Sequence, residues 1–268
     1  MFRKIRNTLS DPRKYFLAAL ARLQQQICGF FQNTPFFMQG QMDIHPKSRW
    51  HNPHFSKLTG GFFLIGDSQQ RMICNLETWD NTRRDMLILL LRSILERNVH
   101  GDLAELGVYK GHTARLIHYY MPERNLHLFD TFEGFTDRSV ASERAHTNNT
   151  ISPLHFSDTS LDAVKTYILP QNNNVKFYKG FFPESIPDTL TTTRFAFVHL
   201  DADLYEPILN GLEYFYPKMS PGGIIIIHDY NAWPGARKAV DDFFAEKPEV
   251  PIPMPDKSGS ALLIINSH

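Results

Sequence analysis

The chain has 268 residues, of which 42% are hydrophobic, and its 28 lysine and arginine residues balance 28 aspartate and glutamate residues. This length favours one α/β domain with an appendage, and the apolar content is sufficient for a buried core. Because the formal net charge is zero, no overall field draws the chain to nucleic acid or to anionic lipid.

The first hundred residues differ in character from the rest. We expect residues 1–100 to form a helical or irregular extension that covers a substrate or contacts another subunit, and residues 101–268 to form the main domain. Apolar residues at helical spacing predict helices at 16–27 and 82–97. No apolar run reaches the roughly 18 residues of a transmembrane helix. Cys28 and Cys74 fit no metal-ligand spacing, and their scarcity favours a reducing cytoplasm.

After residue 101, short apolar runs alternate with helical patterns. This alternation predicts a Rossmann-like, doubly wound, mostly parallel sheet with helices on both faces, whose final strand could enter antiparallel. The polar stretch 139–157 is expected to be a mobile loop. The predicted strands are 103–108, 126–130, 175–178, 195–200, 224–227 and 261–265, and the predicted helices are 112–120, 161–169, 207–216 and 235–244.

The first predicted strand runs into a glycine-containing turn before a helix. Ligands of such sheets bind outside the carboxyl ends of the strands, and Gly107 and Gly111 would let the backbone approach a ligand closely. A dinucleotide site would carry G-x-G-x-x-G and bind pyrophosphate at the helix N-terminus. Here one glycine is missing and Glu105 would repel a pyrophosphate, so a positively charged cofactor that carries an amino acid fits better. The alternative is a purely structural turn.

Two further strand ends carry candidate cofactor contacts. Asp130 ends the second strand, where an acid can accept hydrogen bonds from both ribose hydroxyls, and Phe132 lies in the adenosine site or in the core. After the third strand, Gly180 permits close approach and Phe181 could cover an adenine ring. A helix cap or loop acid is the alternative for Asp130.

Acids gather at the ends of the fourth and fifth strands. Asp201, Asp203 and Asp229 lie beside His228, and like charges this close are costly unless a cation or hydrogen-bond donors compensate them. A hard divalent ion such as Mg²⁺ would supply that charge and bind the substrate oxygen, while a remaining acid or histidine removes the proton. The structural alternatives are a helix cap at Asp203 and a core histidine at 228.

The segments ELGVYKG, LFDTFEGF, HLDADLYEP with YPKMSPGG, and IIHDYNAWPGARKAVDDFF together resemble the macrocin O-methyltransferase family of class I methyltransferases. The resemblance implies S-adenosylmethionine as methyl donor, Mg²⁺ and a mobile lid. Family members often carry two adjacent acids where this chain has His228-Asp229, so His228 is a ligand, a base or a bystander, and retention of the metal is open. By the resemblance, Glu105, Gly107 and Gly111 border the methionine part of the cofactor, Asp130 binds the ribose, Asp201 and Asp229 are metal ligands, and Asp203 is the general base. The expected cofactor residues further include Tyr109, Thr113, Thr131, Phe132, Gly180, Phe181 and Asp201. His228 is a further candidate metal ligand and catalytic residue.

These features predict an O-methyltransferase that acts on a hydroxyl of a sugar or a sugar-containing natural product, in the cytoplasm and as a homo-oligomer. A phenol or catechol is the competing acceptor. A nicotinamide-dependent oxidoreductase and a non-catalytic binding protein on the same fold are the competing functions. Neither the acceptor nor the hydroxyl that is methylated follows from the sequence.

Overall fold

The computed structural model describes residues 80–168 and 174–266. The helix expected at 16–27 and both cysteines lie outside these residues, and the domain boundary near residue 101 stays a prediction. The helices are α5 (Asn81–Glu96), α6 (His112–Tyr120), α7 (Asp137–Thr147), α8 (Leu161–Ile168), α9 (Tyr205–Phe215) and α10 (Pro234–Phe244), with short 3₁₀ helices η2 (Asp188–Leu190) and η3 (Tyr216–Lys218). The strands are β1 (Asp102–Leu106), β2 (Leu126–Asp130), β3 (Val175–Lys179), β4 (Phe195–Leu200), β5 (Met219–Ile227), β6 (Ile252–Pro253) and β7 (Ala261–Ile264).

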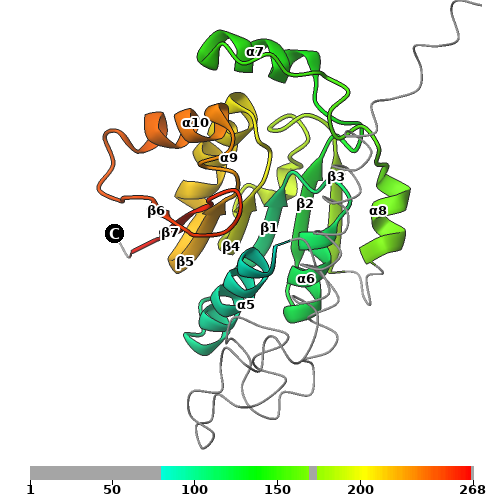
Figure 1. The fold of residues 1–268 in the computed structure, drawn as a ribbon. Coiled ribbons are helices and arrows are strands. Elements are labelled where there is room, and N and C mark those ends of the chain that lie inside the picture. The colour runs from blue at the N-terminus through cyan, green and yellow to red at the C-terminus, as the bar shows by residue number, and fades with distance from the viewer. Residues whose placement is uncertain (1–79, 169–173, 267–268) are drawn as a thin grey trace, which may run out of the picture. The chain divides into compact units, whose positions relative to one another are not determined.

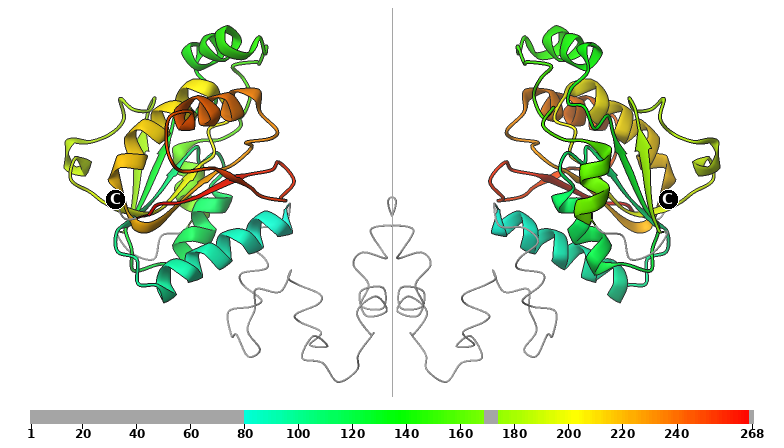
Figure 2. Two further views of the ribbon diagram at one scale, coloured as in Figure 1. Left: turned by 90° about the vertical axis from the view of Figure 1, so that its left-hand side faces the viewer. Right: turned by 90° about the vertical axis from the view of Figure 1, so that its right-hand side faces the viewer.

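The strands form one sheet in the order β3-β2-β1-β4-β5-β7-β6. β1 to β5 are parallel, and β7 enters antiparallel beside β5. Figures 1 and 2 show α5 and α6 on one face of the sheet and α9 and α10 on the other. This architecture confirms the predicted Rossmann-like fold, including the antiparallel last strand.

The chain order reverses between β1 and β4, because successive strands run outward from this pair on either side. The loops after these two strands therefore separate and leave a crevice at their carboxyl ends, which is where ligands of open α/β sheets bind. The register places Glu105 beside His199 and Leu106 beside Leu200, so Gly107 and Asp201 leave the sheet at the same level.

The expectation of a mobile loop at 139–157 is wrong for its first half, which belongs to helix α7. The helix is polar along most of its length, so it lacks the apolar periodicity by which a helix is recognised in a sequence. Thr136 caps its N-terminus by accepting a hydrogen bond from the backbone N–H of Ser139 at 3.1 Å. Figure 1 shows α7 beyond the carboxyl ends of the strands, beside α9 and α10.

Two strands at the C-terminal side also differ from expectation. β5 begins at Met219 rather than 224, because the Pro221-Gly222-Gly223 segment that reads as a turn is accommodated as an irregularity in its pairing with β4. The short strand β6 has no counterpart among the predicted elements, since two residues carry no readable alternation.

Aromatic rings fill the core between β2, β4 and α9. Phe215 contacts the rings of Phe129, Phe182 and Phe195 at centroid distances of 5.1–6.0 Å, and all four side chains are buried. Burial of each such ring stabilises the fold by about 1.5–3 kcal/mol. This packed core supports the strand ends that carry the candidate site residues.

No helix in the described ranges is both long and apolar enough to cross a bilayer.

Candidate active site

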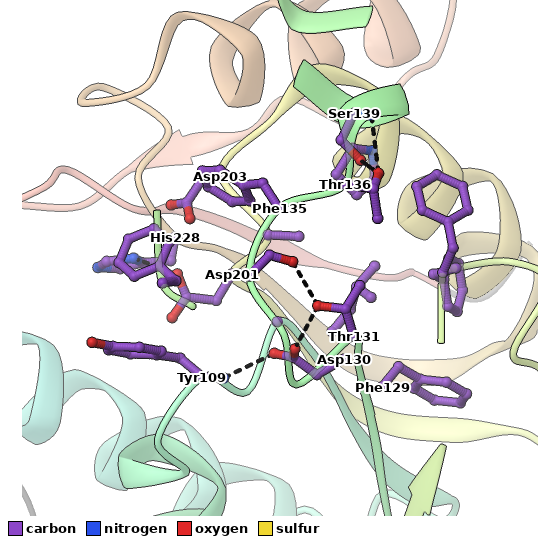
Figure 3. Close-up of a pocket in the computed structure, with 18 of the residues that line it drawn as sticks. Tyr109, Phe129, Asp130, Thr131, Phe135, Thr136, Ser139, Asp201, Asp203 and His228 are labelled. Carbon is purple, nitrogen blue, oxygen red and sulfur yellow. Dashed lines mark hydrogen bonds and ion pairs between the residues drawn. The ribbon is translucent and has the colours of Figure 1, made fainter. Parts of the chain in front are cut away.

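A cavity of about 280 Å³ opens at the carboxyl ends of the central strands. Figure 3 shows Asp201, Asp203 and His228 together on one side of it and Phe129 on the far side, with Asp130 and Thr131 between them. The cavity therefore has an acidic end and an aromatic end. Its lining includes Arg83, Gly107, Tyr109, Asp130, Thr131, Phe135, Thr136, Ser139, Phe156, Gly180, Phe181, Phe182, Asp201, Asp203, His228 and Asp229.

At Gly107, the loop after β1 lies in close contact with the loop after β4. The φ of Gly107 is +86°, and a Cβ at this position would lie 2.1 Å from the carbonyl oxygen of Asp201. Both the left-handed conformation and the contact exclude any side chain. This glycine is what allows the loops after β1 and β4 to meet at the cavity.

Asp130 shapes the loop after β1. Its Oδ2 accepts hydrogen bonds from the backbone N–H groups of Val108 and Tyr109 at 2.6 and 2.9 Å, and its Oδ1 accepts one from Phe132 at 2.6 Å. A carboxylate offers about four acceptor positions, and the Thr131 hydroxyl, which donates to Oδ1 at 3.4 Å, takes a fourth. Asp130 lines the cavity, but much of its hydrogen-bonding capacity holds the loop.

Asp201 lies between two basic side chains. Arg83, from the first turn of α5, donates from Nη2 to its Oδ2 at 2.6 Å, and His228 Nδ1 lies 2.7 Å from its Oδ1. Burial alone would raise the pKa of Asp201, but the charges of His228 and Arg83 outweigh burial and lower it. The carboxyl group is therefore ionised and its charge is compensated within the site.

His228 is surrounded by carboxylates. In addition to Asp201, its ring lies 3.3 Å from Asp229 and 4.0 Å from the buried Asp256. Burial alone would lower its pKa, but Asp201 outweighs burial, and the pKa rises to about 9. At neutral pH the ring is an imidazolium, which has no lone pair with which to take up a proton.

Replacing His228 with glutamine is expected to remove a pH-dependent part of the stability. Since the folded pKa of about 9 exceeds the ordinary value of 6.5, this contribution is fully present below pH 6.5 and is lost as pH rises through about 9. A shift of this size corresponds to about 3 kcal/mol. Urea unfolding in the presence of a chelator would measure it, and equal pH slopes for both proteins would contradict the assignment.

Asp203 and Asp229 form a second acidic pair. Both are buried and both adopt left-handed backbone conformations, with φ of +58°. Burial and a hydrogen bond with Asp229 raise the pKa of Asp203 well above its usual value. For Asp229, the hydrogen bonds with His228 and Asp203 outweigh burial and lower the pKa. Asp203 is thus the group of this pair that binds a proton more tightly.

Beneath this cluster lies the buried pair of Glu105 and His199. Glu105 Oε1 lies 2.9 Å from His199 Nδ1, whereas its Oε2 is buried without a hydrogen-bond partner. Burial, reinforced by Asp201, raises the pKa of Glu105. Burial also lowers the pKa of His199 to about 3, so this imidazole is neutral.

Most of the predicted site residues line this one cavity, and four of them do not. Those at the wall are Gly107, Tyr109, Asp130, Thr131, Gly180, Phe181, Asp201, Asp203, His228 and Asp229. Glu105, Thr113 and Phe132 are buried, and Gly111 faces Val164 and Ile168 of α8. Every assigned role in cofactor binding, metal binding or catalysis stays a prediction.

Arg83 is a site residue that the sequence did not reveal. It comes from α5, which the sequence assigns to the extension, and it reaches Asp201, Thr113 at 3.2 Å and His199 at 3.4 Å. Its position results from the packing of α5 on the sheet beside β4, β5 and α6. No local pattern signals such a long-range contact.

The cavity fits S-adenosylmethionine. Gly107 lets the backbone come close without a Cβ, and Phe182, whose ring contacts Phe129 at a centroid distance of 5.3 Å, and Phe181 contribute aromatic surface to the lining. The acids at the other end suit a sulfonium.

Magnesium fits the acidic end less well. Asp201, His228 and Asp229 offer ligand atoms within 4.8 Å of one another. Mg²⁺ takes oxygen ligands, however, and both oxygens of Asp201 are already bonded by Arg83 and His228. Metal binding would also have to remove the proton from the His228 ring. The side chains balance the charge of this cluster, so no catalytic step is assigned to a metal.

Three curated relatives resemble this chain in sequence. The chain is 30% identical over 172 residues to the 8-demethyl-8-(2,3-dimethoxy-alpha-L-rhamnosyl)-tetracenomycin-C 4'-O-methyltransferase of Streptomyces olivaceus, with 60% of this chain and 64% of the relative covered. It is 28% identical to the demethyldecarbamoylnovobiocin O-methyltransferase of Streptomyces niveus, over 58% of this chain and 63% of that one. The mycinamicin III 3''-O-methyltransferase of Micromonospora griseorubida is 30% identical, over 57% and 64%. The alignments thus span somewhat less than two thirds of each relative.

Solved structures show the same fold. The O-methyltransferase NovP superposes with a TM-score of 0.60 at 24% identity, over 69% of this chain and 80% of that one. The calicheamicin methyltransferase CalS11 superposes with a TM-score of 0.54 at 19% identity, over 82% and 94%. The model of the macrocin O-methyltransferase family (TylF) matches residues 60–260. Because this match includes every strand around the cavity, the chain belongs to the macrocin O-methyltransferase family.

Proposed function

We propose that this protein is an S-adenosylmethionine-dependent O-methyltransferase that methylates a hydroxyl group of a sugar or of a sugar-containing natural product. The observation that carries the proposal is the convergence of Gly107, Asp130, Asp201 and Asp229 on one cavity, with an aromatic end and an acidic end. Family membership supports the type of reaction, and the rhamnosyl group in the name of the Streptomyces olivaceus relative supports a sugar as acceptor.

When bound, S-adenosylmethionine supplies a methyl group activated by its sulfonium, so the protein contributes mainly alignment and exclusion of water. Phe181 and Phe182 would bind the adenine, and Asp130 the ribose. This leaves the acidic end for the acceptor hydroxyl.

Asp203 is the proposed general base. Its pKa is raised, so its carboxylate is a stronger base than that of an ordinary aspartate, whereas the charged His228 lacks a lone pair for this task. S-adenosylmethionine would supply the methyl group and leave as S-adenosylhomocysteine when its sulfur–methyl bond breaks, while the Asp203 carboxylate would take the proton from the acceptor hydroxyl as the oxygen gains the methyl group. Arg83 and His228 keep the neighbouring Asp201 ionised without an added cation.

Calorimetric titration with S-adenosylhomocysteine tests the proposal directly. We expect saturable binding of this compound and none of NAD⁺, followed by methyl transfer from S-adenosylmethionine to a member of an acceptor panel. The panel should contain nucleotide sugars, rhamnosylated polyketides and catechols. Tight binding without turnover on any acceptor would favour a non-catalytic protein, and binding of NAD⁺ alone would favour an oxidoreductase.

Treatment with a chelator tests the magnesium assistance that the family resemblance implies. Loss of turnover in a chelator, with recovery on addition of Mg²⁺, would support Asp201 and Asp229 as ligands. Full turnover in the chelator would refute the metal and leave Arg83 and His228 as the compensating charges.

A further inference from the structure

Glu143 is a fully buried acid outside the cavity, on a helix that is otherwise polar and largely exposed. Its Oε2 accepts a hydrogen bond from the backbone N–H of Tyr205 at 2.9 Å, and its Oε1 accepts one from Thr147 Oγ1 at 2.9 Å. A Cβ added to Gly235 would lie 1.8 Å from the same Oε2. One carboxyl group thus touches the first residue of α9 and the first turn of α10.

These two helices follow directly on the acids of the cavity. Asp203 lies two residues before the start of α9, and Asp229 lies five residues before the start of α10. Both acids hold left-handed backbone conformations, which persist where the surrounding structure fixes them. A carboxylate is also favoured where the N-terminal ends of two helices meet, since the backbone N–H groups there point outward.

The other end of α7 forms part of the cavity wall. Thr136, the N-cap of α7, and Ser139 in its first turn both line the cavity, as does Phe135 just before them. Ser139 and Glu143 are one helical turn apart and so lie on the same face of α7. Whatever holds Glu143 in place therefore also sets the position of this wall relative to Asp203 and Asp229.

We propose that Glu143 is a positioning residue that fastens the α7 wall to the two loops bearing Asp203 and Asp229, and thereby preforms the acceptor end of the cavity. The inference rests on the proposed function. The proposed cofactor end is built on Gly107, Asp130 and Gly180, and the side-chain hydrogen bonds of Glu143 go to Thr147 and Tyr205 instead, so the two ends of the cavity should respond differently when Glu143 is changed.

The test compares Glu143→Ala with Glu143→Gln. Alanine leaves the Tyr205 N–H without its acceptor, so we expect the KM of the acceptor to rise about 10- to 100-fold, because small misplacements of this kind are costly. The affinity for S-adenosylhomocysteine should stay unchanged. Glutamine still offers one oxygen to Tyr205 and should recover most of the loss. Hydrogen exchange of residues 137–147 should accelerate in Glu143→Ala.

Arg144→Ala is the matched control, since this exposed neighbour on the same helix has no part in the junction. Equal exchange and equal acceptor KM in Glu143→Ala and Arg144→Ala would overturn the proposal. Equal losses of acceptor and cofactor affinity would also overturn it, because they would indicate general destabilisation. Should the wild-type protein fail to bind S-adenosylhomocysteine, the proposed function fails, while the exchange data still report whether Glu143 holds α7.

Discussion

Replacing Asp203 with asparagine is expected to lower the rate of methyl transfer by about 10²- to 10⁴-fold, the usual contribution of a general base. Asparagine tolerates the left-handed conformation found at this position, so the backbone should keep its course and the loss should reflect the missing carboxylate. Initial rates with an acceptor used by the wild-type protein measure the effect. The affinity for S-adenosylhomocysteine should not change.

The pH dependence of the methyl-transfer rate gives a second test of Asp203. Because burial raises the pKa of Asp203, the form that accepts a proton is lost as pH falls through that raised value, and the wild-type rate should fall with it. The rate of Asp203→Asn should not show this fall at low pH. The exposed Asp188 supplies the control, and Asp188→Asn should retain both rate and profile. Wild-type turnover in Asp203→Asn would show that Asp203 is not the general base.

Replacing Gly107 with alanine should abolish cofactor binding and strongly destabilise the fold. The new Cβ would lie 2.1 Å from a carbonyl oxygen of the next loop, on a residue whose φ of +86° disfavours any side chain. Strain and overpacking each cost about 1–3 kcal/mol, so a loss of about 2–6 kcal/mol is expected. Urea unfolding and calorimetry with S-adenosylhomocysteine measure the two effects.

Gly180 offers a matched comparison for this prediction. Its φ is +141°, but a Cβ there would only reach ordinary contact with Ser185 at 3.4 Å. Gly180→Ala therefore tests backbone strain without the clash and should lose less stability than Gly107→Ala. Equal losses in the two variants would show that the contact between the loops after β1 and β4 contributes nothing.

The fold was predictable because its strands are short, apolar and separated by helical patterns. The predicted bounds of 112–120, 126–130 and 195–200 coincide with α6, β2 and β4. Helix α7 was missed because its polar residues show no apolar face, and the contacts of its fully buried Glu143 depend on α9 and α10. A tertiary hydrogen bond of this kind has no signature in local sequence.

The candidate site was likewise predictable from the sequence only in part. The acids at 130, 201, 203 and 229 follow recognisable strands, so a parallel sheet brings them to one edge without further information. The charge balance among them could not be predicted, since it depends on Arg83 from α5 and on the ring of His228. The left-handed backbone at Asp203 and Asp229 likewise results from how each loop meets its neighbours.

The two borders of the sheet bear on how copies of the chain can associate. One border is β3, which carries the exposed lysines Lys176 and Lys179, and the other is the two-residue strand β6, which contains Pro253. Lysine charge, short length and a residue without an amide proton all discourage an incoming strand. Within the described ranges, pairing of two sheets into a continuous one, and the fibrous growth that follows from it, is therefore disfavoured at both borders.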